Sequence, residues 1–182
     1  MMALAVLVMC LVLVPASGGT WRAVGAARLP FEVPALILFM LQGMLRGRLP
    51  WMTAMAGSWV AFAWGCVCML LLFTVLREWR QPGVSLVGLG IASNVMVVLL
   101  NEGMPYLHPS GRALAFVGPF YRTVTSGTHL AVLGDVLPDP TGRFLVSLGD
   151  LLLCLGAVTF VVASSVRSVV ARDRVEHNRS RG

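Results

Sequence analysis

Long apolar stretches without charged side chains alternate along the chain with short segments that carry the charges. No charged residue occurs in the stretches 1–21, 49–76, 81–101 and 151–166. The stretch 49–76 exceeds the roughly 20 residues that an α-helix needs to cross a bilayer. The pattern therefore predicts membrane-spanning helices rather than the one-sided amphipathic helices of a water-soluble core.

We predict about five spans, at residues 2–17, 29–45, 51–76, 84–101 and 147–167. The first span ends in small residues and a proline, which resembles the exit of a signal peptide. It lacks a basic start, so we expect it to be retained; cleavage after about Gly18, leaving four spans, is the alternative.

Small and polar residues recur at helical spacing on three of these spans, and such stripes let helices approach closely in lipid. On the third span the stripe consists of Ala54, Ser58, Ala61, Gly65 and Cys68. On the fourth it consists of Gly90, Asn94, Val97 and Asn101, and we expect Asn94 to hydrogen-bond across helices. On the last it consists of Ser147, Asp150, Cys154, Ala157 and Ser164. We predict that each stripe faces the other spans.

Composition supports the membrane interpretation and gives it an orientation. Only 12% of the 182 residues are charged and the mean hydropathy is +0.82, which a soluble domain of this size could not tolerate at its surface. The net charge is +6, and all fourteen basic residues are arginines beside the apolar stretches or in the tail, so nucleic acid is not expected as a partner. With the carboxyl terminus in the cytoplasm, nine arginines lie on the cytoplasmic side of the membrane and five on the outside. Because arginines favour the cytoplasmic side, we expect a cytoplasmic carboxyl terminus and an external amino terminus.

The predicted organisation is a single transmembrane bundle over 1–166 followed by a basic cytoplasmic tail over 167–182. Residues 102–146, between the last two spans, are too many for a structureless loop, so we predict an external cap with a short helix at 110–117. The fold class is thus an all-α membrane protein of about five transmembrane helices with a partly helical external cap.

Ionisable residues near membrane depth are costly, which makes the cap the place to look for chemistry. Structural explanations compete with functional ones. Asn101, Gly103 and Pro105 are typical of a helix terminus with Gly or Asn in the left-handed position. Ser147 and Asp150 match a capping box, in which the serine caps the last helix and the aspartate reaches back to it.

The tripeptide Leu-Gly-Asp occurs at 133–135 and again at 148–150, on either side of a proline-rich turn. The turn can bring Asp135 and Asp150 together for acid/base chemistry or cation binding. Arginines of the cap can equally pair with either carboxylate. His108 and His129 have no histidine or cysteine at ligand spacing, and the cysteines lie inside apolar stretches, so we expect no metal site and no cofactor.

Four short segments together resemble a family of small, uncharacterised bacterial integral membrane proteins. They are Asn-Glu-Gly-Met-Pro at 101–105, Ser-Gly-Thr-His at 126–129, Leu-Gly-Asp-Val-Leu-Pro at 133–138 with Pro140, and Ser-Leu-Gly-Asp at 147–150. The family's motifs are N-G-G-x-M-P, G-D-x-I-P-x-P and S-x-G-D, and the resemblance covers about 94–162. Glu102 stands where the family has a glycine, and Thr128 where a basic residue is usual. The resemblance implies a bacterial cytoplasmic membrane location and supplies no reaction.

These observations lead to one list of candidate functional or cap-organising residues: Asn101, Glu102, Met104, Pro105, His129, Gly134, Asp135, Pro138, Ser147 and Asp150. We expect a non-enzymatic structural or accessory component of the membrane, with the lipid bilayer and either a larger membrane complex or a second copy as partners. The alternative is a membrane-embedded enzyme or small transporter that uses Asp135, Asp150 and His129 to handle protons or cations. Inverted repeats, the usual sign of a carrier, are not visible.

Overall fold

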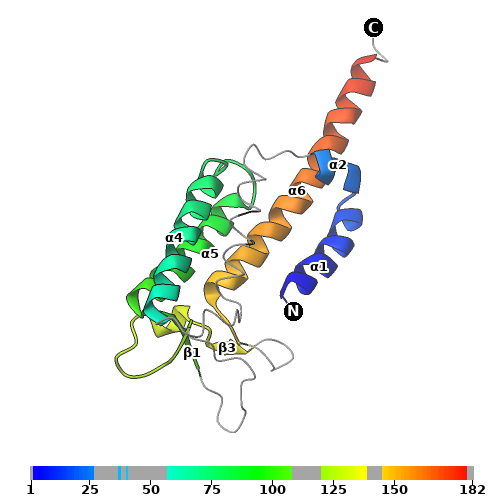
Figure 1. The fold of residues 1–182 in the computed structure, drawn as a ribbon. Helices are drawn as coiled ribbons and strands as arrows, with labels where there is room; N and C mark the ends of the chain where they lie inside the picture. The colour runs from blue at the N-terminus through cyan, green and yellow to red at the C-terminus, as the bar shows by residue number, and fades with distance from the viewer. Residues whose placement is uncertain are drawn as a thin grey trace.

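The computed structural model describes residues 2–26, 37, 40, 57–107, 120–138 and 145–179. Its helices are α1 (Met2–Ala16), α2 (Trp21–Ala26), α4 (Gly57–Leu76), α5 (Val84–Leu100) and α6 (Leu148–Arg179). Helix α5 lies between α4 and α6, and α1 and α2 pack on α6 (Figure 1). The short strands gather at one end of the bundle, here named the cap end, and α6 projects beyond the opposite, tail end (Figure 1).

Two helices are long and apolar enough to cross a membrane, namely Ser58–Leu76 of α4 and Leu148–Val166 of α6. Helices α1 and α5 are apolar but shorter. The protein is therefore mostly helical with two candidate spans, and the predicted number of five is not shown. The predicted span 29–45 lies outside the described residues except for Ile37 and Met40. The last helix continues to Arg179, past the predicted end at 167.

The fold differs from the expected all-α class, because the described part of the cap, which was expected to be partly helical, contains short strands. Strand β1 (Met104–Tyr106) pairs in parallel with β2 (Tyr121–Thr123), and β3 (Leu137–Pro138) pairs antiparallel with β4 (Leu145–Val146). A short 3-10 helix, Ala131–Leu133, precedes a bridge between Tyr106 and Asp135. Prolines within two of these strands oppose helix, and their Tyr, Thr and Val residues favour extended backbone. The predicted helix at 110–117 lies outside the described residues.

Glycines set the contact between α5 and α6. Gly90 faces Gly149 and Gly83 faces Gly156, so the glycines are seven residues apart on each of two antiparallel helices. A Cβ atom on Gly90 would lie 2.5 Å from the Gly149 carbonyl oxygen, and one on Gly156 would lie 2.6 Å from that of Gly83. The two backbones are in direct contact, as small residues permit in membrane helices.

The predicted stripes can be compared with the buried positions of each helix. On α4, Ala61, Gly65 and Cys68 are buried as predicted, whereas Ser58 is half-buried and Ala54 lies outside the described residues. On α5, Gly90, Asn94 and Val97 are buried as predicted, and Asn101 at its end is half-buried. On α6 the prediction is wrong beyond its first turn. Its buried positions there are Gly156, Val158 and Ser165, whereas the predicted Cys154, Ala157 and Ser164 are only half-buried. The glycine contact with α5 decides which side of α6 faces inward.

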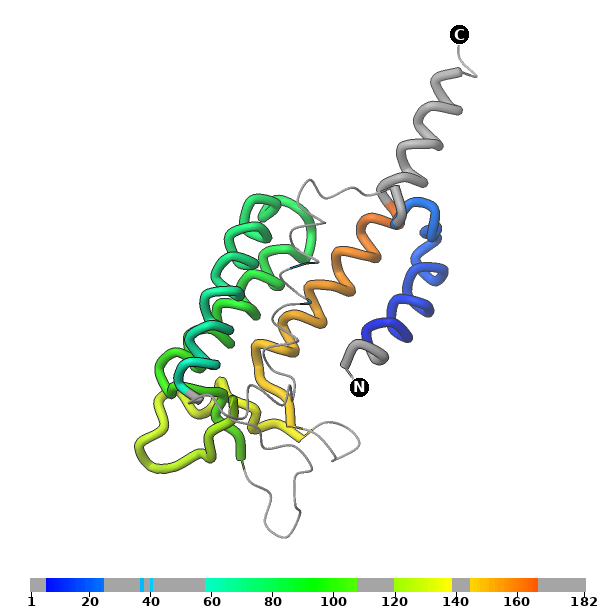
Figure 2. Tube along the Cα trace, viewed as in Figure 1, coloured from blue at the N-terminus to red at the C-terminus, as the bar shows by residue number. Residues whose placement is uncertain are grey.

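The hydrophobic core runs from the middle of the bundle into the cap. Val60, Trp64 and Leu71 of α4 pack with Ile91, Val95 and Val98 of α5, and Met104 and Phe120 extend this cluster into the cap. The Trp64 and Phe120 rings meet edge to face with 5.2 Å between their centroids. Figure 2 shows the chain leaving α5 into the cap and returning into α6 at the same end. The cap is therefore packed onto α4 and α5.

Candidate functional site at the junction of helix 5, the cap and helix 6

Three polar side chains form a closed hydrogen-bond network between α5 and the start of α6. Asn94 Nδ2 donates to Asp150 Oδ1 at 2.9 Å, and Ser147 Oγ donates to Asn94 Oδ1 at 2.9 Å. The Asp150 backbone N–H donates to Ser147 Oγ at 3.0 Å. Asn94 is 4% exposed and Ser147 is fully buried. A buried network in which each member has a partner rigidifies the packing around it.

The local sequence explains how this network forms. Ser147 caps α6, as its spacing from Asp150 predicts, and leaves a hydroxyl hydrogen to give to Asn94. Gly149 makes room for the amide, because a Cβ atom there would collide with Asn94 Oδ1. The Asp150 carboxylate differs from the expectation: it accepts from Asn94 across the helix interface rather than reaching back. Asp150 lies in the first turn of α6, where the helix dipole stabilises a negative charge.

Asn101 fixes the cap loop to the end of α5. Its Nδ2 donates to the Val97 carbonyl at 2.8 Å and to the His129 carbonyl at 2.9 Å, while the His129 backbone N–H donates to Asn101 Oδ1 at 2.8 Å. One side chain thus satisfies three backbone groups. The His129 side chain is exposed, and its backbone supplies the contacts.

The chain leaves α5 through Glu102, which has an unusual backbone conformation. The Gly103 backbone N–H donates to the Val98 carbonyl at 2.9 Å, the bond of a Schellman helix terminus. The residue in the left-handed position is Glu102, with φ of 52°, and not the Gly or Asn expected from the sequence. This conformation costs a non-glycine residue about 1 kcal/mol, and a glycine at this position would avoid the cost.

Most of the remaining candidate residues lie in β1 or against it. The Asp135 backbone N–H donates to the Pro105 carbonyl at 2.8 Å, and the Leu107 N–H donates to the Asp135 carbonyl at 3.1 Å. Met104 is 1% exposed and the Asp135 side chain 5%. A Cβ atom on Gly134 would lie 2.5 Å from the Pro105 carbonyl oxygen. Pro138 is exposed on β3.

The structure therefore does not bring the ten candidates into one site. Asn101, Glu102 and the His129 backbone lie at the end of α5, and Pro138 is exposed on β3. Ser147 and Asp150 join Asn94, while Asp135 and Gly134 lie against the backbone of β1. Sequence reasoning missed Gly149 and the partners of Asn94, although the seven-residue glycine spacing was a usable signal. Within the described residues, no group of three or more His, Cys, Asp or Glu side chains is arranged to hold a metal ion.

A family model described as "Family of unknown function (DUF5317)" matches residues 28–162. The chain belongs to the DUF5317 family. The predicted membership of an uncharacterised family is confirmed, and the matched range includes the whole junction of this DUF5317 protein. Neither a curated protein nor a solved structure matches the chain.

Proposed function

We propose that this DUF5317 protein is an integral component of the bacterial cytoplasmic membrane with a structural or accessory, partner-binding role and no catalytic activity. The observation that carries the proposal is that its polar side chains make hydrogen bonds between the helices and the cap. Asn94, Asn101, Ser147 and Asp150 all hold the cap and the helices together. They stabilise a fixed cap on the membrane surface, which suits recognition of a partner.

The surface of the helices supports the membrane part of the proposal. Large apolar side chains are exposed along α1, α4 and α6, among them Leu11, Val12, Trp59, Phe62, Leu70, Phe73 and Leu155. Exposure on this scale is unfavourable in water and favourable in lipid. Trp59 lies in the first turn of α4 and Trp79 lies three residues after its end; both are exposed, and tryptophans are enriched at the two membrane interfaces.

The five-span topology remains part of this proposal. Helix α2 lies at the tail end and α4 begins at the cap end (Figure 1). A span within 29–45 would join these two ends, and the arginine distribution would place the cap outside.

Reporter fusions test this orientation. We expect fusions at Arg80 and Gly182 to report cytoplasm and a fusion at Ser110 to report the outside, because nine of fourteen arginines then lie inside. A cytoplasmic Ser110 would reverse the orientation.

The partner-binding role is tested separately, by affinity purification of the full chain from native membranes and mass spectrometry of what co-purifies. Purification of the protein alone, from membranes gently solubilised, would count against that role.

One observation favours the alternative of proton or cation handling. The Asp135 side chain, a carboxylate near membrane depth, is only 5% exposed. Under this alternative Asp135 and Asp150 would act with His129. A paired site would require both carboxylates.

The substitutions Asp150→Asn and Asp135→Asn separate the two functions. The amide that replaces Asp150 keeps an oxygen acceptor for Asn94, so we expect a stability loss of no more than about 1 kcal/mol and normal partner retention. Partner retention or growth is measured beside thermal unfolding in detergent. A folded but inactive Asp150→Asn protein would reject the structural role, whereas normal behaviour of both variants would dismiss the enzyme and the transporter.

A further inference from the structure

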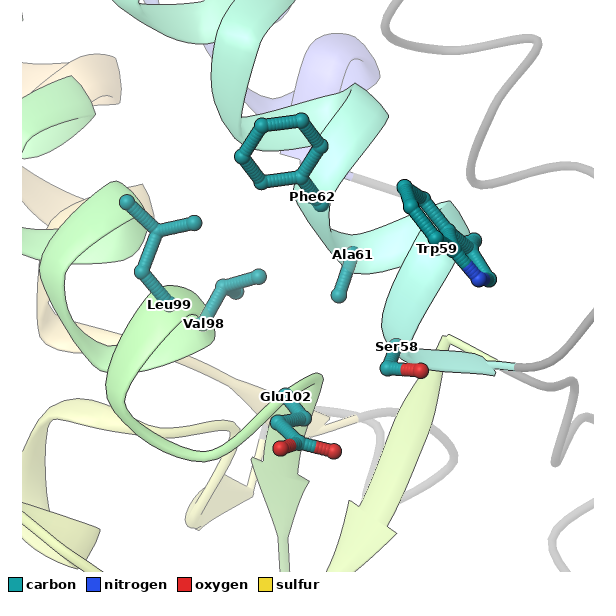
Figure 3. Close-up of a pocket in the computed structure, with 7 residues that line it drawn as sticks. All are labelled: Ser58, Trp59, Ala61, Phe62, Val98, Leu99 and Glu102. Atoms are coloured by element: carbon teal, nitrogen blue, oxygen red, sulfur yellow. The ribbon is translucent and has the colours of Figure 1, made fainter.

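An elongated groove runs between α4 and α5 on the exposed side of the bundle. At the cap end it is a hollow of about 510 Å³ lined by Ser58, Trp59, Ala61, Phe62, Val98, Leu99 and Glu102 (Figure 3). A second hollow of about 400 Å³ shares Phe62 and Leu99 with the first and continues past Gly65 to Leu70. Because the two hollows share these two residues, they lie next to each other along α4, and together they are here named the α4–α5 groove.

The α4–α5 groove is polar at one end only. Glu102 and Ser58 lie at its cap end, and the Glu102 side chain is exposed (Figure 3). Deeper along the helices the lining consists of aromatic, aliphatic, glycine and cysteine residues. A ligand that matches this distribution has one cationic end and one long apolar end.

The length of the groove matches one leaflet of a bilayer. From Ser58 to Leu70 the groove follows α4 for about 18 Å at the usual rise per residue. Half of the hydrocarbon core of a bilayer is about 15 Å thick. Trp59, which lines the same hollow as Glu102, belongs to the residue type that lies at the level of lipid headgroups. An acyl chain entering at Trp59 would therefore end near the bilayer midplane.

The backbone at Glu102 adds an independent observation. Its φ of 52° is unusual for a residue with a long side chain, and such strained residues cluster at ligand sites. Glycine would fit this helix terminus better, so the carboxylate at the mouth of the groove comes at a cost in stability.

We propose that the α4–α5 groove binds a single phospholipid whose headgroup carries a primary amine, of the phosphatidylethanolamine class. One acyl chain lies along Phe62, Gly65 and Leu99, and the ammonium group pairs with the Glu102 carboxylate. A lipid with only a phosphate charge meets an unfavourable carboxylate at the same place. This inference rests on the membrane insertion proposed above.

The test uses the full chain purified in detergent, with phosphatidylethanolamine and phosphatidylglycerol of identical acyl chains as probes. Lipid retention is measured by native mass spectrometry. We expect the wild type to retain phosphatidylethanolamine about three- to tenfold better than phosphatidylglycerol, and Glu102→Gln to abolish the difference. Glu78→Gln is the matched control, because Glu78 follows the other end of α4 and should leave the preference unchanged.

Two further variants keep the result interpretable if Glu102→Gln folds poorly. Glu102→Gly removes the carboxylate and relieves the left-handed strain, so it should unfold at a higher temperature without lipid and still lose the preference. Gly65→Leu narrows the groove at Leu99 and should weaken retention of both lipids.

Three outcomes would overturn the lipid site. They are a wild type without preference, an unchanged preference in Glu102→Gln and Glu102→Gly, and lipid-excluding dimers that bury the groove against a second copy. Membrane fractionation separates this failure from the failure of the proposed function. A protein that is integral to membranes but shows no headgroup preference rejects only the lipid site, whereas a protein absent from membrane fractions rejects both.

Discussion

Gly149→Leu is expected to separate α5 from α6 and to destabilise the protein by more than about 4 kcal/mol. A Cβ atom at this position would collide with Asn94 Oδ1 and lie 2.7 Å from the Gly90 carbonyl oxygen. The obstruction includes backbone, which cannot rotate away as a side chain can. Leucine would therefore break both the glycine contact and the network at Ser147. Thermal unfolding in detergent and the yield of folded protein measure the loss.

Two glycines provide controls for this substitution. Gly127→Leu should be nearly silent, because a Cβ atom there has no neighbour closer than 4.0 Å. Gly65→Leu should fall between the two, because its Cβ atom would meet only the end of the flexible Leu99 side chain, at 2.7 Å. If Gly65→Leu proved more damaging than Gly149→Leu, the contact between α4 and α5 and not the glycine contact would be the tighter interface.

Asn94→Ala is expected to cost about 2 to 4 kcal/mol, since it removes two hydrogen bonds and leaves Ser147 Oγ and the Asp150 carboxylate without their partner on α5. The loss should be measured as a change in the free energy of unfolding. A double-mutant cycle with Asp150→Ala isolates the coupling, for which we expect at least about 1 kcal/mol. Additive losses would show that the two side chains contribute independently and would contradict the network.

The sequence predicts the position of the helices better than their rotation. Uncharged apolar stretches locate α4, α5 and the beginning of α6, and Ser147 locates the first turn of α6. Over Leu148–Val166 helix α6 is apolar except for Asp150, Thr159, Ser164 and Ser165, so its pattern indicates only weakly which side faces α5. The seven-residue glycine spacing carries that information, because only glycines at matching intervals let two antiparallel backbones touch.

The strands of the cap could not be predicted for a different physical reason. Each contains two or three residues, and β1 pairs with β2 across a long connection, so no local pattern specifies them.

The candidate site could be predicted in part. A cross-helix hydrogen bond from Asn94 follows from the cost of an amide in lipid, but its partner Asp150 depends on the register between α5 and α6. The left-handed Glu102 was missed because a carboxylate is a poor indicator of that conformation.

The network at Asn94 also has a consequence for synthesis of the protein. Asn94 is separated from Ser147 by 53 residues and from Asp150 by 56. At the usual speed of translation, roughly 3 to 10 s pass between the synthesis of α5 and that of its partners. In a membrane, a 17-residue helix with an amide in its middle is a weak insertion signal on its own. If the protein is inserted as proposed above, the insertion machinery would have to shelter Asn94 during that interval, or α5 would have to enter the bilayer together with α6 as a hairpin.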